Sequence, residues 1–168
     1  MSLRSGLAIL QRVSIYVSRW FNSIAIASFM LMIAVTFVDV VGAKVFGLPL
    51  KGSFEIVALV QIIAITGALA YTQVKGMHVK IDIVIDRLPK WARLTMHCFN
   101  TLLGLGIFTL LGVESFRYGI SLKRLGEVSG TLIIPHYPFA LWIALSCIPM
   151  GLVLLAELLN SYSEARKK

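Results

Sequence analysis

The chain has 168 residues, of which 58% are hydrophobic and only 14% are charged. A soluble domain is typically about half apolar and about one quarter charged, so this composition excludes a soluble globular protein and indicates a membrane protein. The net charge of +8 does not indicate a nucleic-acid-binding protein, because the basic residues lie at the ends of apolar runs, and anionic membrane lipid is the expected partner.

The N-terminal segment carries three arginines, Arg4, Arg12 and Arg19, and the apolar residues between them recur at roughly helical spacing. This pattern predicts an amphipathic lead-in on the membrane surface. A signal peptide is the competing interpretation. It is disfavoured because the apolar run after Arg19 is long enough to span a membrane and no short apolar region with a cleavage site precedes it.

Four runs contain no Asp, Glu, Lys or Arg, at residues 20–38, 56–74, 94–113 and 128–156. They are 19, 19, 20 and 29 residues long. About 20 helical residues, at a rise of about 1.5 Å each, cover a hydrocarbon core of about 30 Å, so each run can cross once. The sequence therefore predicts an all-α membrane protein, a single domain of four transmembrane helices over residues 1–168. The fourth span is expected at 132–156, with Pro135 and Pro138 marking where its lead-in becomes helix.

The segment Lys75–Arg93 separates the two apolar halves and holds five of the sixteen basic residues. Apolar and charged side chains interleave over residues 79–88, a pattern typical of a short amphipathic helix at a lipid surface. Pro89 should end this helix, and Trp91 follows where an aromatic anchor is expected. A solvated loop with chance alternation remains the alternative.

Orientation follows from the basic residues on each side of the predicted spans. The N-terminus, the Lys75–Arg93 segment and the C-terminus together hold 11 Lys and Arg, and the other side holds 5. The side that retains more basic residues in short loops is cytoplasmic. Both termini are therefore expected in the cytoplasm, and the segments near 39–55 and 114–131 are expected to face outward.

The first outward segment is rich in residues that form turns. Asp39 and Lys44 are candidates for an ion pair near the end of the first helix, and Gly47, Pro49 and Gly52 favour a tight turn. These residues predict a compact connection between the first two helices.

Two local features are expected where the outward segments meet the helices that follow them. Ser53 is a candidate cap of the second helix, and Glu55 lies in its first turn, beside the positive end of the helix dipole. In the second outward segment, Ser129, Gly130 and Pro135 predict an extended stretch before the fourth helix. A capped turn with a purely structural role is the alternative interpretation of the first pattern.

The spans themselves offer little for binding a substrate. Their strongest polar residues are Gln61, Thr66, Asn100 and Thr109, which we expect to form helix–helix hydrogen bonds. No pair of interrupted helices is evident at mid-membrane, so the sequence does not predict a discontinuous-helix transport site. Small residues such as Gly104 offer faces for close packing. The two cysteines lack metal-type spacing, so no metal site is predicted.

Three groups of residues resemble the small membrane subunit of tripartite ATP-independent periplasmic (TRAP) transporters, the DctQ-type family. The first group is Asp39-Val40, Gly42, Pro49-Leu50, Gly52 and Glu55; the second is His78-Val79, Asp82 and Leu88-Pro89; the third is Gly126, Ser129, Thr131-Leu132 and Pro135. Their order around four spans is more specific than any one group. One departure is that an arginine is common directly after the Gly42 position, whereas this chain has Ala43 followed by Lys44.

The resemblance implies a three-component uptake system in a bacterial inner membrane. A periplasmic binding protein would deliver an organic acid to a large membrane subunit, which moves it by a sodium-driven elevator motion. The small subunit would be a scaffold without catalytic activity or cofactors of its own, and sodium would bind the large subunit. The candidate interface or structural residues are Asp39, Gly42, Lys44, Pro49, Gly52, Glu55, His78, Asp82, Gly104, Gly126, Ser129 and Pro135.

Three alternatives belong to other functional classes. Small multidrug-type exporters resemble one another in having a glutamate in the first helix. Residues 20–38 of this chain contain no glutamate, so this class is disfavoured. A haem-bearing respiratory anchor needs two histidines facing each other across helices, and only His78 and His97 lie at similar depth. A four-helix transporter that works alone as a homo-oligomer remains open.

Overall fold

The computed structural model describes residues 2–75 and 90–165. Four long helices make up most of this part of the chain: α1 (Ser2–Val45), α2 (Ser53–Val74), α4 (Lys90–Leu125) and α5 (Tyr137–Ala165). Each contains a stretch long and apolar enough to cross a bilayer, so the predicted all-α architecture with four potential membrane-spanning helices is confirmed. The predicted amphipathic segment 79–88 lies outside the described residues.

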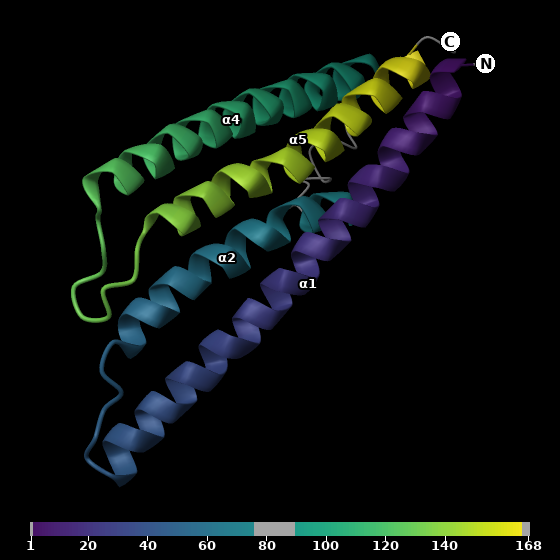
Figure 1. Ribbon diagram of the computed structural model, residues 1–168. Coiled ribbons are helices and arrows are strands. Elements are labelled where there is room, and N and C mark those ends of the chain that lie inside the picture. The colour runs from purple at the N-terminus through teal and green to yellow at the C-terminus, as the bar shows by residue number, and fades with distance from the viewer. Residues whose placement is uncertain (1, 76–89, 166–168) are drawn as a thin grey trace.

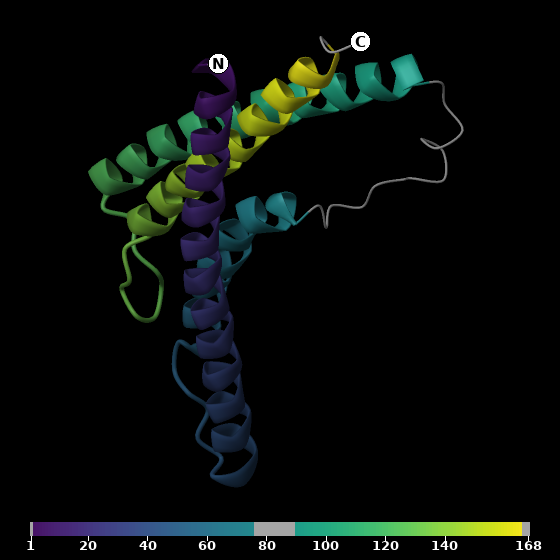
Figure 2. The same ribbon diagram turned by 90° about the vertical axis from the view of Figure 1, so that its right-hand side faces the viewer.

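Along the chain the helices run alternately in opposite directions, and they form an open row, in the order α1, α2, α5, α4, instead of a closed bundle (Figure 1). The neighbours α2 and α5 therefore run in the same direction. The main pairings are α1 with α2 and α4 with α5, and α5 also contacts α2 and α1. The start of α1 and the end of α5 lie at the same end of the helices, here called the terminus end (Figure 2). The connections 46–52 and 126–136 lie at the opposite end, the loop end.

Helix α5 is the centre of the packing. Within the described residues, 39% of its most apolar window is buried, compared with 6% for α1 and for α4. Ala70 of α2 packs with Met150 and Leu154 of α5, and Leu105 and Phe108 of α4 pack against this cluster. The apolar faces of α1 and α4 are therefore left largely uncovered by this chain.

Glycines let α4 and α5 approach closely. A Cβ atom on Gly112 would lie 3.1 Å from the Cβ of Cys147, and one on Gly104 would lie 3.5 Å from a methyl carbon of Leu154. Gly119 meets α5 in the same way. The three glycines recur every seven or eight residues and therefore share one helix face. Gly104, a predicted interface residue, thus faces α5 of its own chain.

Helices α1, α2 and α5 meet around Gly67 of α2. The Phe21 ring of α1 stacks on Trp142 of α5 with 5.2 Å between ring centroids. A Cβ on Gly67 would lie 3.1 Å from the Phe21 carbonyl oxygen and 3.3 Å from the Cβ of Ala25. Ser18 is fully buried beside this crossing, one turn before Phe21. A small residue at position 67 is therefore required for the close contact.

The helices extend beyond the predicted charge-free spans. Helix α1 is continuous from Ser2, so the N-terminal lead-in is its first part and not a separate surface segment. Helix α4 continues to Leu125, although the outward segment was expected from residue 114. Glu114 and Arg117 form an exposed ion pair at 3.0 Å, three residues apart on this helix. Charged residues paired in this way can lie within a helix. A charge-free run therefore shows where the helix is apolar, but it does not show where the helix ends.

Helix α5 begins at Tyr137, with Pro138 in its first turn, where the absent proline N–H costs no hydrogen bond. The predicted role of Pro138 in marking the helix start is confirmed. The helix then continues through the fully buried Pro149 without a break. Each of the four helices in the described part of the chain is continuous from its first to its last residue.

The polar residues within the spans differ from prediction. The hydroxyl groups of Thr66 and Thr109 each donate to the carbonyl four residues earlier in their own helix, both at 2.7 Å. The expected helix–helix bonds are therefore wrong for these two threonines, because a threonine in a helix can satisfy its hydroxyl locally. Instead, Gln73 of α2 donates to the Glu157 carboxylate of α5 at 2.8 Å, near the terminus end.

Candidate functional site

The connection 46–52 is a tight turn built on Gly42. The carbonyl oxygen of Gly42 accepts the backbone N–H groups of Phe46 at 3.2 Å and Leu48 at 3.0 Å. A Cβ on Gly42 would lie 2.9 Å from the Leu48 carbonyl oxygen, so the turn folds back directly onto this glycine. Gly47 has φ +67°, a left-handed conformation that favours glycine. The predicted tight turn is confirmed.

Asp39 closes this turn from within α1. Its carboxylate accepts the backbone N–H of Leu50, which follows Pro49, at 2.8 Å. The predicted ion pair with Lys44 is wrong: of the described residues, Asp39 pairs with the Leu50 amide and not with that lysine. Five residues along an α-helix correspond to a rotation of about 140° between side chains, so Asp39 and Lys44 point in different directions.

Gly52 is the N-cap of α2. It has φ +79°, and the helix start has no side-chain capping bond, so the predicted cap by Ser53 is wrong. Ser53 is instead the first helical residue. A Cβ on Gly52 would lie between 2.4 and 2.9 Å from three carbon atoms of the Leu132 side chain. Because Leu132 belongs to the connection 126–136, the two connections touch at this glycine.

Glu55, in the first turn of α2, joins the start of this helix to the connection 126–136 through three hydrogen bonds. Its carboxylate accepts the Ser129 hydroxyl at 2.6 Å and the backbone N–H groups of Thr131 at 2.7 Å and Leu132 at 3.0 Å. We call this group of four residues the Glu55 clasp. Both carboxylate oxygens are used, and the helix N-terminus also favours negative charge there. The predicted placement of Glu55 in the first turn is confirmed.

The connection 126–136 is itself closed by short-range bonds. Ser129 donates its N–H to the Ile134 carbonyl at 2.9 Å, and its hydroxyl accepts the Ile134 N–H at 3.3 Å. An antiparallel bridge joins Val128 to Pro135, and Gly126 ends α4 with φ +66°. The expected extended stretch is therefore wrong, because Ser129 and Pro135 lie on opposite sides of a closed turn.

Ile133 lies at the tip of this turn in an unusual conformation. Its φ is +56°, which is a rare value for a β-branched residue, and 70% of the side chain is exposed. The bonds made by Leu132 and Ile134 hold it on both sides. Other large apolar side chains are exposed near the ends of α1 and α2, and with Ile133 they define the loop-end surface: Phe46, Leu48 and Phe54.

Most of the predicted site residues gather at the loop end. The structure places Asp39, Gly42, Pro49, Gly52, Glu55, Gly126, Ser129 and Pro135 within the two connections or the adjoining helix turns. Lys44 is exposed in the last turn of α1. His78 and Asp82 lie outside the described residues. In the part of the chain that the structure covers, no three His, Cys, Asp or Glu side chains are grouped for metal binding.

Sequence reasoning missed the partners in the clasp, although it singled out Glu55 and Ser129 separately. These residues are 74 positions apart, and two of the three donors are backbone N–H groups, which no side-chain pattern reveals. It also missed the steric role of Leu132 against Gly52. A backbone approach of this kind gives no signal in a single sequence beyond the glycine itself.

The chain was compared with protein families, curated proteins and solved structures. Residues 32–164 match the family described as tripartite ATP-independent periplasmic transporters, DctQ component. The comparisons with curated proteins and with solved structures give no match. The matched region contains the whole Glu55 clasp, all of α2 and α4, the part of α1 from residue 32 onward, and all but the last residue of α5.

Proposed function

The chain belongs to the DctQ component family of tripartite ATP-independent periplasmic transporters, and on this premise we propose that it is the scaffold subunit of a sodium-coupled carrier for an organic acid anion. The large membrane subunit would bind sodium and the anion and would perform the elevator motion in a bacterial inner membrane. This chain would hold that subunit in place and bind no cofactor itself. The observation that carries the proposal is the open row of helices, whose outer faces lack partners within the described chain.

The uncovered faces support a large apolar partner. The apolar stretch of α1 spans 37 residues, and only 6% of its most apolar window is buried. Large side chains are exposed along it, including Ile26, Phe29, Met30, Ile33, Phe37 and Val40. Without the hydrophobic effect, helices in lipid associate by close packing and interhelical hydrogen bonds. We propose that the large subunit covers part of these faces and that lipid covers the rest.

The loop end is proposed to contact the periplasmic binding protein. The Glu55 clasp fixes the connection 126–136 to the start of α2, and Leu132 meets Gly52 at the end of the connection 46–52, so exposed Phe46, Leu48 and Ile133 are presented by one ordered structure. Preorganisation lowers the entropy that is lost when a partner binds. The clasp would thus act indirectly, by positioning a contact surface, without touching the transported anion.

The proposed orientation places the terminus end in the cytoplasm and the loop end in the periplasm, from the ratio of 11 to 5 basic residues. We expect a cytoplasm-dependent reporter fused after Lys168 to be active and a periplasm-dependent reporter at the same position to be inactive. The converse fusions within the connection 46–52 provide the control. Activity of only the periplasm-dependent reporter after Lys168 would contradict the orientation.

The scaffold function is tested by uptake in liposomes containing this chain alone, the large subunit alone, or both, each with the binding protein and a sodium gradient. We expect uptake of the radiolabelled organic acid only when both membrane subunits are present. Dissipating the sodium gradient is the control and should abolish this uptake. Uptake by this chain alone would contradict the scaffold role and would favour the homo-oligomeric transporter.

A further inference from the structure

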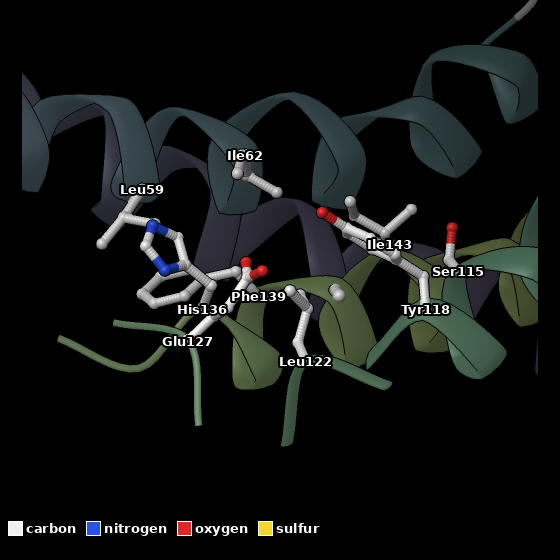
Figure 3. Close-up of a pocket in the computed structure, with 10 residues that line it drawn as sticks. Leu59, Ile62, Ser115, Tyr118, Leu122, Glu127, His136, Phe139 and Ile143 are labelled. Atoms are coloured by element: carbon white, nitrogen blue, oxygen red, sulfur yellow. The ribbon is translucent and has the colours of Figure 1, made fainter. Parts of the chain in front are cut away.

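A pocket of about 370 Å³ lies at the loop end between α2, α4 and α5 (Figure 3). Its apolar lining comes from all three helices and comprises Leu59, Ile62, Leu122, Phe139, Ala140 and Ile143. Helices α2 and α4 both pack on α5, while contacts between α2 and α4 are minor, so α5 forms the floor of a space between them. Pockets of about 300–1,000 Å³ are typical of small-molecule sites.

Four polar side chains also line this pocket: Ser115, Tyr118, Glu127 and His136 (Figure 3). The Nδ1 atom of His136 is buried and has no hydrogen-bond partner among the described residues. Leaving a buried polar atom unpaired is unfavourable, so a ligand that bonds to this nitrogen would gain stability from it. Glu127 is the one carboxylate in the lining, and it is not within ion-pairing distance of His136.

The charge in the lining selects between possible ligands. Glu127 is the one carboxylate in the lining, and no lysine or arginine lines the pocket, so the pocket favours a cationic group over an anionic one. An imidazole nitrogen that carries no hydrogen can accept a hydrogen bond. A primary ammonium group carries three N–H donors. It can therefore donate to the Glu127 carboxylate, and the polar lining offers further acceptors to its remaining N–H groups.

We propose that this pocket binds a phospholipid whose headgroup carries a primary ammonium, with part of an acyl chain along the apolar lining. The lining residues on α2, α4 and α5 belong to stretches apolar enough to cross a membrane, so lipid is available to this part of the chain. The apolar stretch of α4 has 28 residues, or about 42 Å, which exceeds a hydrocarbon core of about 30 Å. Its last turns, with Tyr118 and Leu122, therefore reach headgroup depth.

A bound lipid would supply contacts that this part of the fold does not make by itself. A bound ammonium would pair the buried His136 nitrogen, and the acyl chain would fill the space between α2 and α4, which make few contacts of their own. This lipid would also adjoin the connection 126–136, because Glu127 and His136 belong to it and are joined by a backbone hydrogen bond of 3.3 Å. Its occupancy would stabilise the base of the loop that carries the Glu55 clasp.

The test compares two lipids that differ in N–H donors. The purified chain, stripped of native lipid, is titrated with phosphatidylethanolamine and with phosphatidylcholine of identical acyl chains, and bound lipid is counted by native mass spectrometry. We expect about tenfold tighter binding of phosphatidylethanolamine, because the trimethylated headgroup keeps its charge but has no N–H donor. Glu127→Gln should bring the ratio close to one, and His136→Leu should lower it independently.

Glu114→Gln is the matched control, since Glu114 is an exposed carboxylate on α4 outside the pocket, and it should keep the wild-type ratio. Unchanged unfolding temperatures establish that the variants are folded. Equal binding of the two lipids by the wild-type chain would overturn the proposal, as would a preference retained in Glu127→Gln. Tighter binding of phosphatidylglycerol, which has no ammonium, would also overturn it. If the large subunit displaces the lipid when it binds, the pocket is a site for a side chain of that subunit, and the proposal is overturned.

Discussion

Gly52→Ala is expected to destabilise the protein strongly, because two independent costs meet at this residue. A left-handed conformation costs a non-glycine residue about 1–2 kcal/mol, and Gly52 has φ +79°. The added methyl group would also overlap the Leu132 side chain, 2.4 Å from its Cγ, and overpacking typically costs about 1–3 kcal/mol more. The measurement is the unfolding midpoint of the purified chain, followed by tryptophan fluorescence.

Gly47→Ala is the matched control for this prediction. Gly47 has φ +67° but no atom within 4 Å of an added Cβ, so the control carries the conformational cost alone. The double variant Gly52→Ala with Leu132→Ala should recover part of the stability lost in Gly52→Ala. If Gly52→Ala and Gly47→Ala lower the midpoint equally, the contact with Leu132 contributes nothing.

Glu55→Ala is expected to release the connection 126–136 from α2, with a large rise in backbone hydrogen exchange. The substitution removes the acceptor of all three clasp bonds, so the N–H groups of Thr131 and Leu132 lose their partners. We expect exchange across 126–136 to accelerate by about tenfold or more, measured by mass spectrometry of that peptide. Glu55→Gln should have a smaller effect, because its amide retains one acceptor oxygen.

Ser129→Ala provides an independent arm of the same experiment. It removes one clasp donor and also the acceptor of the Ile134 N–H, while both backbone donors to Glu55 remain. Its effect should lie between those of the wild type and Glu55→Ala. Glu114→Ala removes an exposed ion pair on α4 and should leave the peptide unchanged. Wild-type exchange in Glu55→Ala would contradict the role of the clasp.

The sequence was sufficient to predict four potential membrane-spanning helices, since a run without charge is a direct consequence of crossing hydrocarbon. It was insufficient for the helix ends. Helix α4 passes Glu114 and Arg117 without interruption because charged side chains on an exposed face do not interrupt backbone hydrogen bonds. Residue patterns therefore determine where a helix is apolar more securely than where it begins or ends.

The site was predictable as a set of residues but not as a set of contacts. The sequence predicts a turn at Gly52 and an acidic residue, Glu55, in the first turn of the second helix, because both are local features of the chain. The Leu50 amide bound by Asp39 and the Leu132 amide bound by Glu55 are determined by how the chain folds back on itself. The composition of a chain does not show which side chain a backbone N–H will bind. The prediction therefore gave Asp39 the wrong partner, Lys44 instead of the Leu50 N–H.

The central position of α5 has a consequence for biogenesis. Every other described helix contacts α5, and it is the last of the four to leave the ribosome. The α1 and α2 pair must therefore remain in the bilayer without its final neighbour until translation has passed Ala165. During that interval the Phe21 ring has no Trp142 to stack on, and lipid must cover the small-residue face around Gly67. Completion of the row is thus a late, post-insertion step, and any partner that recognises the finished row must wait for it.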